Sequence, residues 1–371
     1  MSALARADYR SDEMTSDLTN RRDFDSRDTA APLMGEVLTV DRVVAETAEA
    51  ITVGFALPDE LAEDYRFAPG QFLTLAVPSD RTGWVARCYS VSSSPDQPGL
   101  AVTVKRTRDG YASNWLCDNI SVGDCLRVLA PSGLFSPRSP ESDLLLCSAG
   151  SGITPAMSIL RATLESITGR IALFYANVTE ESIIFRDELA ELGERYGERL
   201  VVKHWLEAER GRPGAEDFSR WAAPYRDREI FICGPAPFMH MVRAGAAQAG
   251  FDTFRIRTEE YRSLTGDPFE PIAEITDEDL SDAAQTEVVI DGETHHLVWP
   301  TTHTLVDLMV LNGIDTPYAC REGKCGACTC RLAEGEVDLG RTDALEPEDI
   351  ADGYILGCQA HPAAKVVKIE F

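Results

Sequence analysis

The sequence predicts a multidomain protein built from an antiparallel β-barrel, an α/β domain with a parallel sheet, and a smaller α+β domain. The chain has 371 residues, which exceeds the size of one ordinary domain. Its apolar pattern changes near residue 139, from short alternating stretches to apolar strands separated by amphipathic stretches of helical length. A strongly acidic segment then sets off the C-terminal part. These three observations indicate separate folding units.

Residues 33–138 have the pattern of an antiparallel barrel. They contain the alternating stretches EVLTVDRVV, AITVGFAL, QFLTLAVP, LAVTVKRT and CLRVLAP, separated by Gly, Pro and Asp turns. Residues 139–262 contain the apolar strands DLLLCSAG, RIALFYAN, RLVVKHWL and EIFICGP between helix-length stretches. Such alternation predicts a parallel sheet with crossover helices. Residues 1–32 have few apolar side chains, and we expect a disordered tail, with a short packed helix as the alternative.

The segment 263–284 and the residues beyond it predict a linker and a third domain. The segment holds seven acidic residues, no basic ones and two prolines, which favours an extended, solvated linker. In residues 285–371, EVVIDGETHHLVWP predicts a hairpin that turns at Asp291 and Gly292. An apolar helix, TLVDLMVLNG, and a cysteine-rich loop follow.

Charge and cysteine content exclude several classes of function. The formal net charge of −26 argues against nucleic acid or an anionic membrane as a partner, because both attract basic surfaces. Neither a signal peptide nor an apolar run of about 18 residues is present, so we expect no membrane segment. Ten cysteines without a secretory signal point to the reducing cytoplasm, where clustered cysteines are metal ligands more often than disulfides.

Four cysteines form the most specific motif. Their spacing, C-x4-C-x2-C-x29-C, matches the plant-type [2Fe-2S] pattern and predicts these metal ligands: Cys320, Cys325, Cys328 and Cys358. A structural zinc site is the alternative, but zinc sites usually pair two short knuckles rather than three ligands in one loop. Cys330 lies in a strand-like stretch, CTCRL, and we expect it to point away from the metal.

Two segments of the barrel predict a flavin site. The run RCYSVSS resembles the R-x-Y-S-x-x-S signature of ferredoxin reductases, and VKRTRDGYASNWL resembles their second flavin segment. On a strand, Arg87 and Tyr89 share one face, so the guanidinium could reach a phosphate while the ring packs on the flavin. Taken alone, both segments would be an ordinary strand and turn. The expected flavin-binding residues are Arg87, Tyr89, Ser90, Ser93, Lys105, Gly110, Tyr111, Ala112 and Ser113.

The α/β segment carries a nucleotide motif. The turn G-x-G-x-x-P and the later run IFICGPAPFM resemble the nucleotide half of ferredoxin reductases. The expected nucleotide-binding residues are Gly150, Gly152, Thr154, Pro155, Cys233, Gly234 and Pro235. The resemblance implies that Thr154 faces both flavin and nicotinamide and that Cys233 contacts the reactive nicotinamide carbon. We therefore expect Cys233, Thr154 and Ser90 at the place of hydride transfer, although Cys233 could be a plain buried strand residue.

The stretch ANVTEES bears on the choice of nucleotide. It supplies Glu180 and Glu181 and no arginine, where a 2′-phosphate would need positive charge. The sequence therefore favours NADH over NADPH, while Arg186 keeps NADPH open.

The whole order of domains resembles the reductase components of multicomponent oxygenases, in which the last domain is a plant-type ferredoxin of β-grasp fold. The resemblance is strongest to the reductases of 3-ketosteroid 9α-hydroxylases, through SDRTGWVARCYSVSSSP, YRSLTGDPF, YACREGKCGAC and LEPEDIADGYILGCQA. It implies electron transfer from NADH to FAD, to the cluster, and then to a terminal oxygenase of the Rieske type. Reductases of phenylacetyl-CoA epoxidase or of quaternary-amine demethylases, and a stand-alone diaphorase, are the alternatives. The long tail and long linker depart from the family core.

Overall fold

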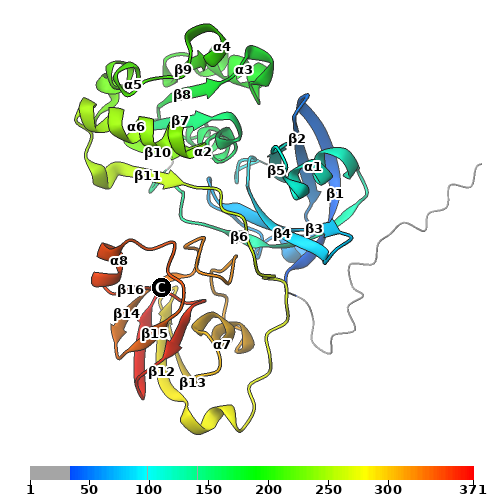
Figure 1. The fold of residues 1–371 in the computed structure, drawn as a ribbon, viewed down its shortest axis with the longest axis vertical. Coiled ribbons are helices and arrows are strands. Elements are labelled where there is room, and N and C mark those ends of the chain that lie inside the picture. Colours follow the sequence, from blue (N-terminus) through cyan, green and yellow to red (C-terminus); the bar gives the residue numbers. More distant parts are fainter. Residues whose placement is uncertain (1–33, 98, 140) are drawn as a thin grey trace, which may run out of the picture.

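The computed structural model describes residues 34–97, 99–139 and 141–371, and it has three domains in chain order (Figure 1). The predicted tail over residues 1–32 lies outside the described residues. Each domain has its own hydrophobic core, so the predicted multidomain organisation is confirmed. Within the described ranges, no helix is both long enough and apolar enough to cross a membrane.

The N-terminal domain is an antiparallel six-stranded sheet that closes on itself. In pairing order its strands are β4 (Gly83–Ser90), β3 (Phe72–Ser79), β6 (Cys125–Ser132), β1 (Glu36–Thr47), β2 (Ala50–Ala56) and β5 (Leu100–Lys105). Val91, directly after β4, bridges Val102 in β5, which joins the two edges of the sheet. Leu73 and Leu75 belong to the core, on which helix α1 (Tyr111–Asn119) packs through Leu116. This is the predicted barrel.

The central domain is a five-stranded parallel sheet with helices on both faces. In pairing order its strands are β11 (Ile256–Glu259), β10 (Glu229–Cys233), β7 (Leu144–Ala149), β8 (Ile171–Asn177) and β9 (Leu200–Leu206). The helices are α2 (Ile153–Glu165), α3 (Arg186–Tyr196), α4 (Glu207–Arg210), α5 (Ala215–Ala222) and α6 (Ala236–Ala249). Leu146 and Leu173 face α2 and α3, whereas Phe174 faces α5 and α6. The strand order reverses at β7, so the crevice between the ends of β7 and β10 is where such sheets bind ligands.

The C-terminal domain is a mixed sheet crossed by one main helix. Its strands are β13 (Glu293–Trp299), β12 (Ala284–Ile290), β18 (Val366–Glu370), β14 (Thr329–Glu334) and β16 (Tyr354–Leu356), with a separate pair, β15 (Val337–Leu339) and β17 (Ala360–Pro362). The predicted hairpin turns at Asp291 and Gly292, both at positive φ. Helix α7 (Leu305–Leu311) packs on the core through Leu305 and Leu308, and α8 (Pro347–Ala351) is short. One helix across a mixed sheet is the expected β-grasp arrangement.

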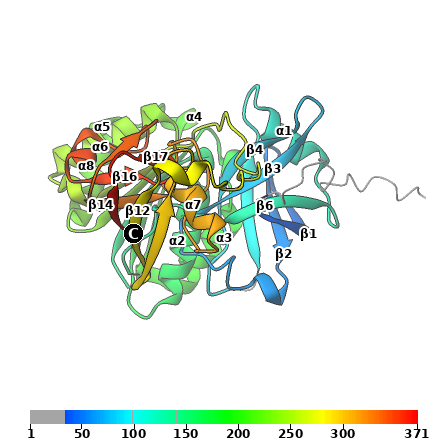
Figure 2. The same ribbon diagram turned by 90° about the horizontal axis from the view of Figure 1, so that it is seen from below.

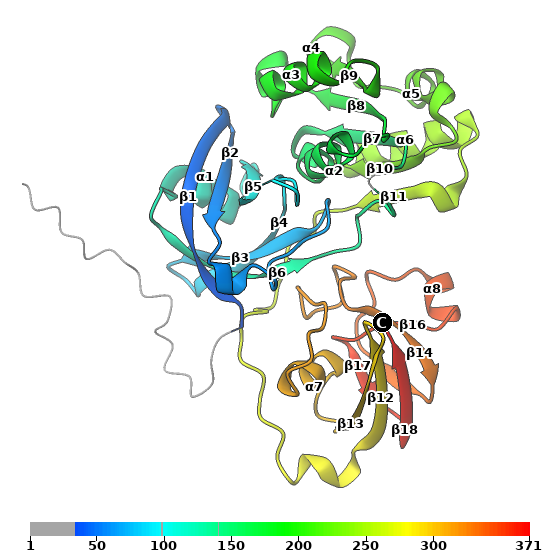
Figure 3. The ribbon, with the colours of Figure 1, turned by 180° about the vertical axis from the view of Figure 1, so that it is seen from behind.

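The C-terminal domain lies below the other two in Figure 1, and the view from below has it in front of the central domain with the barrel to one side (Figure 2). The connecting segment runs extended past the barrel and around the C-terminal domain (Figure 3). Its first half is not solvated as predicted, because Leu264, Phe269 and Ile272 are buried. Phe269 meets Trp84 of β4 edge-on, with ring centroids 6.4 Å apart. The prediction of a solvated linker rested on the carboxylates of this segment, whereas its apolar side chains favour burial.

Candidate redox site

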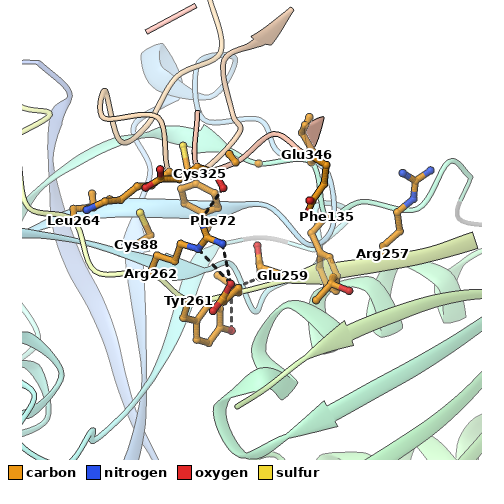
Figure 4. Close-up of a pocket in the computed structure, with 18 of the residues that line it drawn as sticks. Phe72, Cys88, Phe135, Arg257, Glu259, Tyr261, Arg262, Leu264, Cys325 and Glu346 are labelled. Atoms are coloured by element: carbon orange, nitrogen blue, oxygen red, sulfur yellow. Dashed lines mark hydrogen bonds and ion pairs between the residues drawn. The ribbon is translucent and has the colours of Figure 1, made fainter. Parts of the chain in front are cut away.

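A cavity of about 500 Å³ lies where the three domains meet (Figure 4). Its walls include parts of β3 and β4 of the barrel, β11 and the chain that follows it, and the cysteine loop of the C-terminal domain. The lining residues that matter for chemistry are Phe72, Cys88, Ser90, Glu259, Tyr261, Lys324 and Cys325. One cavity therefore extends from a group of polar side chains to the cysteine loop.

The polar end of the cavity is a hydrogen-bonded network. Ser90 Oγ donates to Glu259 Oε2 at 3.1 Å and also lies 3.1 Å from Tyr261 Oη. Tyr261 Oη is 2.9 Å from Thr154 Oγ1, which donates to the carbonyl oxygen of Ser151 at 3.0 Å. The network takes Ser90 from the barrel, Thr154 from the helix that follows the glycine turn, and Glu259 from the end of β11. The network thus fixes the two N-terminal domains against each other at one point.

Cys233 and the glycine turn are packed closely behind this network. Cys233 ends β10, is 1% exposed, and has the Tyr261 hydroxyl within hydrogen-bond reach of its thiol. A Cβ on Gly152 would lie 2.0 Å from the carbonyl oxygen of Cys233, so only glycine permits this approach. Gly150 has φ +54°, and a Cβ there would be 3.5 Å from Lys105 Nζ. The turn is a cradle from which side chains are excluded, as a bound pyrophosphate requires.

Two helices begin at the same crevice. Thr154 and Pro155 lie in the first turn of α2, and Gly234 and Pro235 directly precede α6. The main-chain N–H groups at a helix N-terminus attract phosphate groups. The crevice between β7 and β10 therefore suits the pyrophosphate of a dinucleotide.

Glu259 has an unusual environment for a carboxyl group. Burial raises its pKa to about 8, and the hydrogen bond with Ser90 only partly offsets this effect. The group is therefore largely protonated at neutral pH, whereas the carboxyl group of a surface glutamate would be ionised.

The four predicted cysteine ligands come together in the C-terminal domain. Cys320, Cys328 and Cys358 are buried and Cys325 is half-buried. The Cys320 thiol lies within hydrogen-bond reach of Cys325 and Cys358, which holds its pKa well below the usual range. The main-chain N–H groups of Glu322 and Cys358 point at the sulfurs of Cys320 and Cys328, each at 3.4 Å. Such N–H groups stabilise negative charge on thiolates.

This donor set fits a two-iron cluster better than a zinc ion. Soft thiolates among apolar walls suit iron and sulfide, and the walls include Val306, Leu356, Ala319 and Ala327. Three of the four cysteines come from one loop and the fourth is remote in sequence, which is typical of a [2Fe-2S] cluster, whereas structural zinc usually takes its ligands from two short knuckles. Cys330 belongs to the core of the C-terminal domain, as predicted for a residue that points away from the metal.

The cysteine loop packs against the barrel across a small apolar contact. Side chains alternate along β4, so Cys88 faces away from Arg87 and Tyr89. Burial raises the pKa of the Cys88 thiol to about 12, which keeps it neutral. We call this contact the seam, and it consists of Phe72, Cys88, Ala319, Cys325 and Ala327.

A second cavity, of about 700 Å³, lies on the barrel at the start of α1. Gly110 precedes the helix, and Tyr111, Ala112 and Ser113 form its first turn. The lining residues include Arg81, Gly110, Tyr111, Asn114 and Trp115. A helix N-terminus beside an arginine suits a second pyrophosphate, that of a flavin dinucleotide.

The remaining predicted flavin residues lie in different surroundings. Arg87 donates to the carbonyl oxygens of Ala86 and Leu264, at 2.7 and 3.2 Å. Tyr89 is half-buried against the barrel core. Ser93 is buried, and its hydroxyl accepts the main-chain N–H of Ala101, so the structure does not bring it to the cavity with Ser90.

Sequence reasoning missed Glu259 and Tyr261. Glu259 is the last residue of β11 and Tyr261 lies two residues beyond it, and neither belongs to a motif with a spacing of its own. The strand that places them, β11, was not among the four predicted strands, so the sequence offered only a weak signal, a carboxyl and an aromatic side chain two residues apart.

Comparisons with known proteins identify the class. The oxidoreductase FAD-binding domain matches residues 38–136, the oxidoreductase NAD-binding domain matches 146–244, and the 2Fe-2S iron-sulfur cluster binding domain matches 288–363. In this order they define a flavin and iron-sulfur oxidoreductase that uses FAD, a [2Fe-2S] cluster and NADH.

Curated relatives define the family more closely. The ferredoxin reductase component of 3-ketosteroid-9-alpha-monooxygenase from Rhodococcus rhodochrous is 53% identical over 340 residues, which span 90% of this chain and 96% of that protein. The component of the same name from Mycolicibacterium smegmatis is 48% identical, over 92% and 99% of the two chains. A component of the 1,2-phenylacetyl-CoA epoxidase of Escherichia coli is 32% identical, over 90% and 97%. The chain belongs to the ferredoxin reductase family that contains these proteins.

Solved structures share the fold. Phthalate dioxygenase reductase, described as a modular structure for electron transfer from pyridine nucleotides to [2Fe-2S], aligns with a TM-score of 0.52 at 19% identity, over 91% of this chain and 98% of that one. An intact type IV self-sufficient cytochrome P450 monooxygenase aligns with a TM-score of 0.58 at 20% identity, over 90% of this chain and 41% of that one.

Proposed function

We propose that this chain is the NADH-dependent reductase of a 3-ketosteroid 9α-hydroxylase and that it delivers electrons to a Rieske-type terminal oxygenase. The observation that carries the proposal is the single cavity with the Ser90 network at one end and Cys325 at the other. FAD accepts a hydride and releases electrons one at a time, which a one-electron cluster requires. The identity of 53% to a steroid monooxygenase component supports the choice of pathway.

In this proposal the four clustered cysteines hold the iron and the two cavities hold the flavin. Cys320, Cys325, Cys328 and Cys358 are the cluster ligands. The turn at Gly110 receives the flavin pyrophosphate, with Tyr111, Ala112 and Ser113 in the first helical turn. Tyr89 packs on the flavin ring, Arg87 and Lys105 supply positive charge, and Ser93 supports the loop that follows β4 rather than contacting the flavin.

The polar end of the cavity is proposed as the place of hydride transfer. Gly150, Gly152, Pro155, Gly234 and Pro235 shape the crevice for the dinucleotide. Thr154 and Ser90 orient the nicotinamide and flavin rings through their hydroxyl groups, and the neutral Cys233 closes the site to water. Tyr261 lies between these groups, so a bound nicotinamide requires its ring to move or to share the space.

The charges after β8 support NADH as the preferred donor. Glu180 and Glu181 form the short turn after β8, and both are exposed. Arg186 is engaged by carboxylates, with contacts of 3.9 Å to Glu180 and 3.0 Å to Asp187. An arginine neutralised in this way offers little attraction to a 2′-phosphate.

Reconstitution with a terminal oxygenase tests the proposed function. Purified holoenzyme, NADH, the oxygenase of a 3-ketosteroid 9α-hydroxylase and a 3-ketosteroid should give the 9α-hydroxylated product in proportion to NADH consumed. Electron paramagnetic resonance should detect the reduced Rieske centre of the oxygenase. Better coupling to a phenylacetyl-CoA epoxidase or to a quaternary-amine demethylase would reassign the pathway, and NADH oxidation without any coupling would indicate a stand-alone diaphorase.

A further inference from the structure

The segment 263–270, here called the strap, is bound on both sides. On the barrel side, Trp84 Nε1 donates to Asp267 at 2.9 Å, and the carbonyl oxygen of Phe269 accepts the Met34 N–H at 3.1 Å. Phe269 itself is fully buried. On the other side the strap touches the loop that holds the cluster cysteines. Such a segment is a structural part of the domain interface and not a free tether.

The contact with the cysteine loop is a compact set of polar bonds. Glu322 accepts the main-chain N–H groups of Thr265 and Gly266, at 2.8 and 3.3 Å, and the Thr265 hydroxyl. Lys324 donates to the carbonyl oxygen of Ser263 and to Thr265 Oγ1, both at 3.2 Å. Lys324 also pairs with Glu322 at 3.1 Å, and the two side chains are only 12% and 14% exposed. Water competes weakly with bonds that are this well shielded, and bonds to charged groups are the stronger ones.

Glu322 and Lys324 occupy a special position, because both lie inside the loop between the first two cluster cysteines, Cys320 and Cys325. Gly323, between them, has φ +74°, and a Cβ there would lie 2.2 Å from the carbonyl oxygen of Arg341. The loop backbone is therefore fixed from behind while its two charged side chains reach the strap. A displacement of the strap would therefore also displace the loop that holds the cluster cysteines.

From these contacts we propose that the strap positions the cluster loop on the seam. The contact between Thr265 and Glu322, here called the latch, supplies the two positioning residues. The latch holds Cys325 against Cys88 and Phe72, so that the cysteine loop and the polar end of the cavity keep a fixed separation. Electron transfer between fixed centres falls steeply with distance, and the latch therefore governs the internal step. Among the described hydrogen bonds, those of Thr265 and Glu322 stay within the strap and the cluster loop and do not reach Ser90, Glu259 or Tyr261.

Thr265→Val tests the latch, because it removes the hydroxyl bonds and keeps the shape of the side chain. Its matched control is Thr276→Val, since the Thr276 hydroxyl bonds only to Asp279 in the second half of the connecting segment among the partners described. Thr265→Ser should restore the hydroxyl and the parent behaviour, and Glu322→Gln removes the charge from the other side. All variants are compared as holoenzymes of matched flavin and iron content.

The first readout is amide hydrogen exchange in the oxidised holoenzyme. In Thr265→Val, exchange over residues 263–267 and 320–325 should rise by about tenfold or more, because the variant loses the hydroxyl's bonds to two charged groups, Glu322 and Lys324. The second readout is stopped-flow reduction by NADH without any oxygenase. Cluster reduction should slow, whereas flavin reduction should keep the parent rate.

Exchange and cluster reduction that match those of Thr276→Val would overturn the proposal. A loss in Thr265→Val that Thr265→Ser does not restore would overturn it as well. Both readouts are taken without an oxygenase, so they are independent of whether the proposed steroid pathway is correct.

Discussion

The two ends of the interdomain cavity are built from opposite kinds of side chain. The polar end consists of Ser90, Glu259 and Tyr261, joined by directional hydrogen bonds. The seam consists of Phe72, two alanines, the neutral Cys88 thiol and the proposed cluster ligand Cys325, which pack on one another by apolar contact. Transfer of a hydride depends on the orientation of the reacting rings and on nearby charge. Transfer of an electron through the seam requires contact and exclusion of water, and apolar packing is sufficient for both.

Strand β4 contributes to both ends. Cys88 and Ser90 lie two residues apart on the same face of the strand, one on the seam and one in the polar network. The difference between the two ends therefore arises from what the other domains bring to this strand. The central domain brings Glu259 and Tyr261, and the C-terminal domain brings the cysteine loop. It follows that a change at one end should leave the other end functional.

Cys358→Ser should remove the cluster and leave the polar end functional, and we expect it to have the largest effect. Loss of one cluster ligand should abolish electron delivery to the oxygenase, because the cluster cannot assemble on three thiolates. NADH-driven reduction of ferricyanide at the flavin should stay near the parent rate. Cys125→Ser, in β6 of the barrel, is the matched control. Loss of flavin together with the cluster would instead show that the C-terminal domain supports the flavin site.

The preference for NADH over NADPH tests the charges of the turn that follows β8. We expect kcat/KM for NADH to exceed that for NADPH by about a hundredfold, because a 2′-phosphate would meet the carboxylates of Glu180 and Glu181. Replacing both by glutamine should narrow the ratio, whereas Glu194→Gln, exposed on α3, should leave it unchanged. A parent enzyme that uses both nucleotides equally well would mean that Arg186 or Arg210 binds the phosphate.

The cluster cysteines could be predicted more completely than the polar end of the cavity, for a physical reason, although Cys325 is the one seam residue that was predicted. The first three cluster cysteines are close in sequence, and a cluster allows few spacings, so the motif specifies the site. Ser90, Thr154 and Cys233 were predicted from separate motifs, and the fold brings them together. Glu259 and Tyr261 could not be predicted, because their position depends on where β11 ends relative to the barrel. The alternating patterns predicted the three folds, but not that Phe269 of the connecting segment would be buried against Trp84.

Glu259→Gln should change the polar end and leave the seam intact. Since its pKa is raised to about 8, the parent loses a proton from Glu259 as pH rises through that value. The resulting carboxylate opposes the negative charge that hydride transfer brings to the site, so flavin reduction should slow about tenfold above pH 8. The glutamine variant stays neutral and should have a flat profile in stopped-flow measurements.

The same ionisation also affects stability, with a defined sign. The folded-state pKa of Glu259 lies above its ordinary value of 4.5, so the folded state binds the proton more tightly than the unfolded state. The free energy of unfolding should therefore fall as pH rises from about 4.5 to about 8 and then level off. Glu259→Gln should remove this contribution in chemical denaturation at several pH values. If Glu259→Gln kept the parent's pH dependence of both flavin reduction and the free energy of unfolding, the group that titrates near pH 8 would be another residue.

Raising the salt concentration should weaken docking at the outer surface of the C-terminal domain and should leave both ends of the cavity unaffected. We expect this effect to be the smallest. Residues 287–371 hold fifteen acidic and six basic residues, a net charge of −9 that should steer a basic docking face of the oxygenase. Raising ionic strength screens this attraction, so reduction of the oxygenase should slow several-fold while internal reduction of the cluster by NADH stays constant. Glu348→Gln on the exposed side of α8 should weaken the salt dependence, and Glu60→Gln, equally exposed on the barrel, should not. If internal cluster reduction slowed with salt as well, the charges would be acting on the packing of the domains, through contacts such as Lys324 with Glu322, and not on docking.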